Sequence, residues 1–118
     1  AETWRPQVHF TPPYGRMNDP NGMVFTGGSY HLFYQFNPYA TSFGNIGWGH
    51  AVGPDQVRWQ PWPTAIAPDA ERQIFSGSIV IDERNSSGLC RPRANDADPD
   101  CLVAVYTTNR SGPGQAPR

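Results

Sequence analysis

The stretch from Gly22 to Phe36 reads GMVFTGGSYHLFYQF, and it decides the fold class. Residues 22–26 and 29–36 are rich in β-branched and aromatic side chains, which favour strands. Between them, Gly27-Gly28 tolerates the positive φ angles that a two-residue hairpin turn requires. The stretch therefore predicts an antiparallel β-hairpin.

Two further strands are expected directly after this hairpin. Residues 48–53 predict a third strand, and residues 57–60 a short fourth strand after a turn at Gly53-Pro54-Asp55. A Pro-rich connection is expected at 61–68. Four consecutive antiparallel strands with short links form a meander, which is the unit of a β-propeller blade.

The rest of the chain predicts about half of a second unit. Residues 75–81 and 101–108 predict two strands on either side of a polar loop at 82–100, and residues 109–118 a Gly/Pro-rich tail. The expected fold class is therefore all-β, with one blade and part of a second. A lone blade cannot bury both of its faces, so we expect the 118 residues alone to aggregate or to stay partly disordered at their strand edges.

Composition excludes several classes of protein. The chain has a net charge of −1, only 16% charged residues and 13% aromatic residues, which is unlike a disordered charged tail. Its nine basic residues are all Arg and are scattered, so no basic stripe indicates a nucleic-acid partner. No run of 18 apolar residues is present, so no membrane span is expected.

The two cysteines, Cys90 and Cys101, lie eleven residues apart in a polar stretch. A disulfide that closes this loop in an oxidising compartment is the favoured interpretation, and two free thiols are the alternative. The histidines show no ligand spacing relative to the cysteines, so neither a metal nor a cofactor is expected.

Two patterns bear on the compartment. Asn85-Ser86-Ser87 and Asn109-Arg110-Ser111 fit the N-glycosylation acceptor pattern, which occurs often by chance. The start at Ala1 lacks an initiator Met and fits a mature secreted chain or a fragment equally well. A secreted protein is therefore expected.

The block Met17-Asn18-Asp19-Pro20-Asn21-Gly22 carries the densest group of polar residues. Its last four residues fit a type I turn that leads into the first strand, and this purely structural interpretation is the stronger one for the block alone. The alternative is functional, because a carboxylate held at a strand end, such as Asp19, suits a nucleophile. Asn18 beside it could then donate to a sugar hydroxyl.

Three other segments combine aromatic rings with uncharged polar side chains, namely residues 33–38, 48–52 and 75–78. Aromatic faces stack on sugar rings, while Asn, Gln and Ser bind hydroxyls without charge, as in a carbohydrate pocket. For any single segment, ordinary packing of aromatic residues in a β-core explains the pattern better. All the segments together, in this order, favour a sugar-binding site.

From Trp4 to Thr108 the chain resembles the N-terminal part of glycoside hydrolase family 32, the β-fructofuranosidases, which include invertases, exo-inulinases and levanases. The resemblance rests on six blocks in the family's order: residues 8–12, 17–22, 33–35, 48–52, 67–69 and 75–78. It implies a five-bladed β-propeller catalytic domain, followed by a β-sandwich, of which residues 1–118 are an incomplete N-terminal part.

The resemblance also implies an activity and its residues. Asp19 would be the nucleophile that attacks the anomeric carbon of a terminal fructose unit of sucrose, inulin or levan, with retention through a covalent intermediate. The residues implied to bind substrate are Asn18, Gln35, Ser76 and Trp48, which would hold the fructosyl hydroxyls, and Phe43 and Phe75, which would form apolar walls.

The chain departs from the family pattern in its acidic residues. The family's Arg-Asp-Pro motif is absent, since Ala97-Asp98-Pro99 lacks the Arg. The family's acid/base lies in a Glu-Cys motif, but Glu2, Glu71 and Glu83 do not precede a cysteine, and the last two are expected to be solvated loop residues. The 118 residues alone are therefore expected to be inactive. A non-catalytic carbohydrate-binding chain and a fructosyltransferase of the same family remain alternatives.

Overall fold

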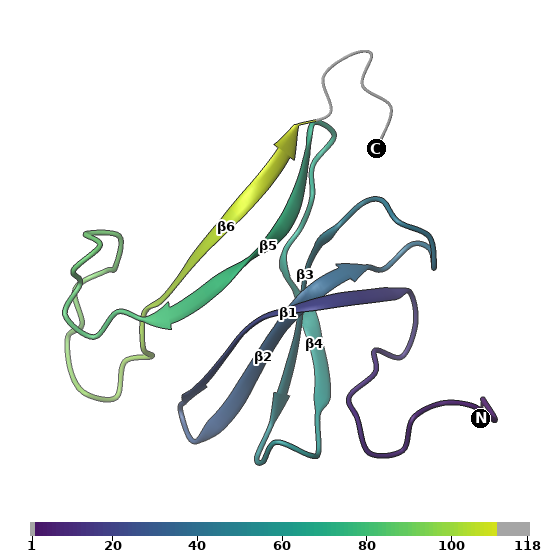
Figure 1. Ribbon diagram of the computed structural model, residues 1–118. Helices are drawn as coiled ribbons and strands as arrows, with labels where there is room; N and C mark the ends of the chain where they lie inside the picture. Colours follow the sequence, from purple (N-terminus) through teal and green to yellow (C-terminus); the bar gives the residue numbers. More distant parts are fainter. Residues whose placement is uncertain (1, 111–118) are drawn as a thin grey trace.

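The computed structural model describes residues 2–110, and it is all-β in this range (Figure 1). Most of the expected Gly/Pro-rich tail, residues 111–118, lies outside the described residues. Between residues 2 and 110 no helix is long and apolar enough to cross a membrane. The strands are β1 (Arg16–Thr26), β2 (Ser29–Asn37), β3 (Gly47–Gly53), β4 (Gln60–Ile66), β5 (Arg72–Ile81) and β6 (Leu102–Arg110).

The first four strands form one antiparallel sheet in the order β1-β2-β3-β4. The predicted hairpin is confirmed, because Thr26 pairs with Ser29 across a turn at Gly27 and Gly28. Both glycines have positive φ, 58° and 78°, which side chains with a Cβ adopt only at a cost. The turn residues thus set the register of β1 on β2.

Strands β5 and β6 form a separate antiparallel pair that lies beside the four-stranded sheet (Figure 1). β5 packs mainly against β1, and the long loop at 82–101 projects from the far end of the pair. One four-stranded unit and two strands of a second are therefore present, as expected. The described chain is flat, with principal extents of 46 × 41 × 16 Å.

Two expectations about element positions were wrong. The fourth strand is Gln60–Ile66, not 57–60, so the expected Pro-rich connection contributes most of β4. Pro61 and Pro63 are tolerated because β4 is the edge strand of its sheet, where a missing N–H does not interrupt a second ladder. Likewise, Asp19–Gly22 is part of β1 and not a type I turn.

The irregularity of β1 explains the second error. Its pairing with β2 shifts register between Met17 and Pro20, and again between Pro20 and Gly22. Pro20 cannot donate to the ladder, and the strand accommodates it by bulging instead of turning. The smaller differences are that β5 begins at Arg72 and β6 continues to Arg110.

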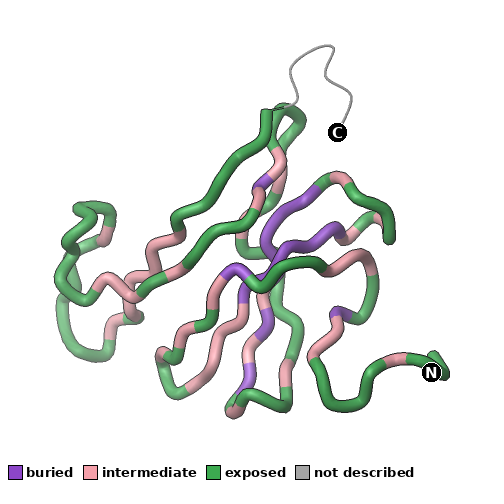
Figure 2. Tube along the Cα trace, viewed as in Figure 1, coloured by how far each residue is buried: buried purple, intermediate pink, exposed green. Residues whose placement is uncertain are grey.

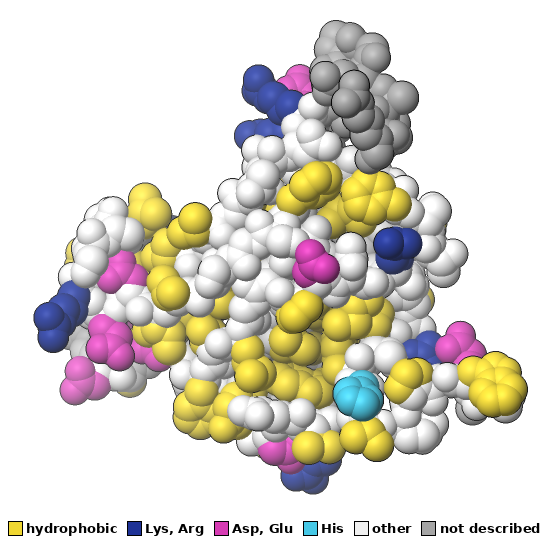
Figure 3. All heavy atoms as spheres, in the orientation of Figure 1, with side chains coloured by type: hydrophobic (Ala, Val, Ile, Leu, Met, Phe, Trp, Pro, Cys, Tyr) yellow, Lys and Arg dark blue, Asp and Glu magenta, His cyan; other side chains and the backbone are white. Residues whose placement is uncertain are grey.

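The core lies where the two sheets meet, along β2 and β3 (purple in Figure 2). Phe33, Trp48 and Ile74 form one buried cluster that spans both sheets. A second cluster consists of Tyr34, Phe36 and Ala51, against which Phe10 packs from the N-terminal segment and Trp59 from the β3–β4 connection. Much apolar surface stays exposed, and Figure 3 shows hydrophobic side chains gathered over the four-stranded sheet.

The loop at 82–101 is closed by a disulfide between Cys90 and Cys101, whose Cα atoms lie 5.8 Å apart, which confirms the favoured interpretation. Inside the loop, the Asp82 carboxylate accepts backbone N–H bonds from Ser86 and Ser87 at 2.8 and 2.9 Å. The loop therefore has its own internal bonds in addition to the crosslink.

We expect Cys90→Ser together with Cys101→Ser to lower the free energy of unfolding by about 2–3 kcal/mol, because the crosslink closes a short loop in the unfolded chain. Urea denaturation of the full-length protein measures this loss, and wild-type protein under reductant serves as the control. Equal midpoints for the oxidised wild type and the double variant would contradict the prediction.

Candidate active site

The site forms where an irregular segment of β1 meets an irregular segment of β5. Asp19 lies in the bulged part of β1, and Ser76 lies where the pairing of β5 with β6 shifts between Ile74 and Gly77. Bulges redirect side chains out of the regular strand alternation. As a result the Ser76 hydroxyl donates to Asp19 Oδ2 at 2.8 Å, across 57 residues of sequence.

The close approach of β1 and β5 depends on a glycine. A Cβ added at Gly22 would lie 2.6 Å from Ile79 Cγ2, far inside van der Waals contact. A larger residue would push β5 away from β1 and would lengthen the Ser76–Asp19 contact. Gly22, three residues after Asp19, is therefore required for the geometry of the site.

A layer of buried polar side chains lies under the exposed pair. Trp48 Nε1 donates to the carbonyl of Phe75 at 2.9 Å, and Gln35 Nε2 donates to the carbonyl of Ile74 at 3.1 Å. Both side chains come from the four-stranded sheet, and both acceptors belong to β5. These bonds fix the β5 backbone directly before Ser76.

Asn21 belongs to the same layer and is only 2% exposed. With its amide oriented so that the oxygen faces the donors, Oδ1 lies 2.9 Å from Trp48 Nε1 and 3.1 Å from Gln35 Nε2. Sequence reasoning missed this role of Asn21. The residue stood inside the expected turn, and only the pairing of β1 with its neighbours turns its side chain inward.

The structure therefore divides the sequence-predicted site residues into two groups. Asn18, Asp19 and Ser76 are exposed, whereas Gln35 and Trp48 are buried with their donors engaged inside the protein. The expectation was that Gln35 and Trp48 would hold sugar hydroxyls. That contact stays a prediction, while the observed bonds show that both side chains position β5.

The apolar walls expected at the site are adjacent to each other. The rings of Phe43 and Phe75 pack edge to face with centroids 6.1 Å apart, and Phe43 is 47% exposed. Arg16, which was not among the expected site residues, has its guanidinium carbon 5.9 Å from the centroid of Phe43. Carboxylate, hydroxyl, aromatic and cationic groups thus border one exposed surface.

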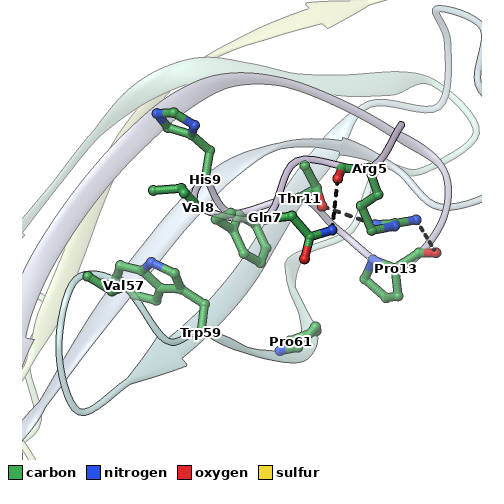
Figure 4. A pocket seen from close by; sticks show the side chains of 10 residues that line it. Arg5, Gln7, Val8, His9, Thr11, Pro13, Val57, Trp59 and Pro61 are labelled. Atoms are coloured by element: carbon green, nitrogen blue, oxygen red, sulfur yellow. Dashed lines mark hydrogen bonds between the residues drawn. The ribbon is translucent and has the colours of Figure 1, made fainter. Parts of the chain in front are cut away.

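A hollow of about 490 Å³ elsewhere on the chain is less suited to this chemistry. It lies between the N-terminal segment and the β3–β4 turn, where Phe10 and Trp59 pack (Figure 4). Arg5 holds the segment in place by donating to Thr11 Oγ1 at 3.0 Å. The lining of this hollow has no carboxylate, so the hollow offers no nucleophile for a glycosyl centre.

Two histidines pair on the four-stranded sheet, on neighbouring strands. His31 Nδ1 lies 3.0 Å from His50 Nε2, and the ring of His50 stacks on Phe33 with centroids 4.4 Å apart. Burial, and to a smaller extent the neighbouring His31, lower the pKa of His50 from about 6.5 to about 4. In residues 2–110 no group of three metal-ligating side chains includes this pair.

This pair makes stability depend on pH. The pKa of His50 is about 6.5 in the unfolded chain and about 4 in the folded one, so the unfolded state binds the extra proton. The contribution of neutral His50 to the free energy of unfolding is therefore fully present above about pH 6.5, and it is lost as the pH drops towards 4. Thermal midpoints at pH 7 and pH 4.5 should differ more for the wild type than for His50→Phe. Equal differences would count against this assignment.

Comparisons with known proteins found similar sequences. Residues 9–116 match the family model described as the glycosyl hydrolases family 32 N-terminal domain. The chain is 50% identical to a levanase of Bacillus subtilis over 94% of its own length and 16% of the levanase. It is 46% identical to an invertase of Schizosaccharomyces pombe, over 93% of the chain and 19% of the invertase.

Solved structures show the same similarity. An exo-inulinase of Aspergillus awamori superposes with a TM-score of 0.77 at 41% identity, over 88% of this chain and 20% of that one. A fructofuranosidase of Schwanniomyces occidentalis, solved with fructosylnystose, superposes with a TM-score of 0.79 at 44% identity. The match covers 89% of this chain and 21% of the fructofuranosidase. The chain thus spans about a fifth of the length of these relatives.

Proposed function

Because this chain belongs to glycoside hydrolase family 32, we propose that it is part of a retaining β-fructosidase that releases terminal non-reducing fructose from sucrose or fructans. Structural neighbours are family 32 enzymes, whose N-terminal domain is a five-bladed β-propeller. Residues 1–118 would be its N-terminal part. The observation that carries the proposal is the exposed Asp19 carboxylate held by Ser76.

In this mechanism Asp19 is the nucleophile. Its Oδ2 accepts from Ser76, while Oδ1 has no hydrogen-bond partner among residues 2–110. Oδ1 attacks the anomeric carbon, and the bond from that carbon to the leaving oxygen breaks as the oxygen takes a proton from a general acid. Water then adds to the same carbon, loses a proton to the conjugate base and releases the Asp19 carboxylate.

The remaining proposed contacts surround this carbon. Asn18 would donate to a fructosyl hydroxyl from the exposed part of β1, and Phe43 and Phe75 would border the ring. Gln35 and Trp48 would act through the β5 backbone they hold, and through any hydroxyl that reaches them. Relatives named levanase, invertase and exo-inulinase support the substrate class.

Secretion is part of the same proposal. The Cys90–Cys101 disulfide suits an oxidising compartment, and a relative from Aspergillus awamori is named an extracellular exo-inulinase. We propose no nucleic-acid or membrane partner, since the nine Arg residues are scattered and the chain carries a net charge of only −1.

The stereochemistry of the reaction tests the proposal. With full-length protein and a fructofuranoside substrate, proton NMR during the first turnovers should show β-fructofuranose before mutarotation. First formation of the inverted anomer, or no fructose at all, would contradict the proposal. Fructo-oligosaccharides as the main product at high sucrose would instead identify a fructosyltransferase.

The general acid is expected to come from outside these 118 residues. Glu2 pairs with Arg5 at 2.7 Å, Glu71 faces Arg110 at 3.9 Å, and Glu83 is exposed in the loop. We therefore expect the isolated chain to release no fructose from sucrose or inulin above the background of its Asp19→Ala variant. Turnover by the isolated chain that Asp19→Ala removes would overturn this prediction.

A further inference from the structure

Arg16, at the start of β1, is a half-buried cation with no ion-pair partner among residues 2–110. Its Nε is fully buried, yet no hydrogen-bond acceptor in the described chain reaches it. The guanidinium instead makes a cation–π contact with Phe43, whose ring centroid lies 5.9 Å from the guanidinium carbon. Arg16 therefore carries a desolvation cost that no anion nearby offsets.

Packing alone does not account for this arrangement. A partly exposed cation–π contact stabilises the fold by less than the cost of leaving a buried donor unsatisfied. A neutral side chain of similar length would cover Phe43 without that cost. An unsatisfied buried polar group in a folded protein calls for an explanation, and a role in function is one such explanation.

Arg16 borders the same surface as the nucleophile. It precedes Asp19 by three residues on β1, which sets their Cα atoms at most about 10 Å apart. On the other side, Phe43 contacts Phe75, and the next residue, Ser76, donates to Asp19. Contacts through Phe43 and Phe75 thus connect Arg16 to the segment that carries Ser76, the partner of the carboxylate.

We propose that Arg16 binds the leaving group, the hydroxylated sugar that departs when Asp19 attacks; this inference rests on the proposed fructosidase function. A guanidinium presents only N–H donors, and the hydroxyl and ring oxygens of a neutral sugar are acceptors. Phe43 holds the guanidinium plane, so little side-chain entropy is lost when the donors engage. The fructosyl unit itself remains with Asp19, Ser76 and Asn18.

The test compares two substrates of the full-length protein that differ only in the leaving group. One is sucrose, whose leaving group is a sugar, and the other is an aryl β-fructofuranoside, whose leaving group has no hydroxyls. Arg16→Met keeps the length of the side chain and removes its charge and donors. Arg91→Met, an exposed loop arginine, is the matched control.

We expect Arg16→Met to lower kcat/KM for sucrose roughly 10-fold or more, and that for the aryl substrate less than threefold. Arg91→Met should change neither. An equal loss on both substrates would mean that Arg16 only supports the fold around Asp19, and no loss on either would mean that it meets no ligand; both results overturn the inference. If Arg16→Met does not fold, Arg16→Gln is measured in the same way.

Failure of the proposed function has a different signature. Asp19→Ala must remove activity on both substrates, because the nucleophile serves any leaving group. If Asp19→Ala stays active, the fructosidase mechanism is wrong whatever Arg16 does. If Asp19→Ala is inactive and Arg16→Met is not selective, only the inference about Arg16 fails.

Discussion

Replacing Asp19 by Ala in the full-length protein is expected to lower kcat/KM for fructose release by roughly 10⁴-fold or more, the scale on which enzymes lose activity with their nucleophile. Asp19 is exposed on a bulged strand, and Ser76 holds one carboxylate oxygen at 2.8 Å. Without the carboxylate the covalent intermediate of the proposed mechanism has no nucleophile, and the hydroxyl of Ser76 loses its partner. Initial rates of fructose release measure the effect.

Asp96→Ala provides the matched control, because Asp96 is an exposed aspartate in the loop at 82–101. It should leave kcat/KM unchanged. Mass spectrometry after rapid acid quench should also find a hexosyl adduct on the peptide that contains Asp19 in the wild type. An adduct on another carboxylate, or full activity of Asp19→Ala, would assign the nucleophile elsewhere.

The second large effect is on stability. Trp48 has no exposed surface and joins the two sheets, since it packs with Phe33 and Ile74 and its Nε1 donates to the Phe75 carbonyl. Trp48→Ala leaves a cavity at that junction and an unpaired carbonyl. We therefore expect a loss of about 3–5 kcal/mol in the free energy of unfolding, measured by urea denaturation of the full-length protein.

Trp4→Ala is the control for this substitution, because Trp4 is 93% exposed in the N-terminal segment. Its expected change is within about 0.5 kcal/mol. Trp48→Phe separates packing from hydrogen bonding, since it keeps an aromatic ring and removes the donor. If Trp48→Ala lowers the free energy of unfolding no more than Trp4→Ala does, the packing of the two sheets does not depend on Trp48.

The hairpin was predictable because its signals are local. Alternating aromatic and β-branched residues on either side of Gly27-Gly28 specify the strands and the turn within fifteen residues. The error at β4 has the opposite origin. Prolines normally argue against a strand, and only the knowledge that residues 60–66 lie at the edge of the sheet makes Pro61 and Pro63 acceptable.

The candidate site was predictable in its residue types and not in its arrangement. The block around Asp19 and the Ser76 segment could be recognised in the printed sequence. The inward turn of Asn21 could not be, because register shifts in β1 break the alternation by which strand faces are assigned. Arg16 was missed for another reason, because its contact with Phe43 is made across 27 residues of sequence and has no local signal.

The sequence by itself thus determined an all-β chain, its first hairpin, and a weakly charged, aromatic set of residues suited to a neutral sugar. Tertiary structure alone decided which of those residues face solvent. Burial of Trp48 and Gln35 and exposure of Asp19 and Ser76 follow from how β5 packs on β1. That packing depends on close backbone approach, bulges and buried hydrogen bonds between residues far apart in the sequence. Short-range sequence patterns therefore do not predict it.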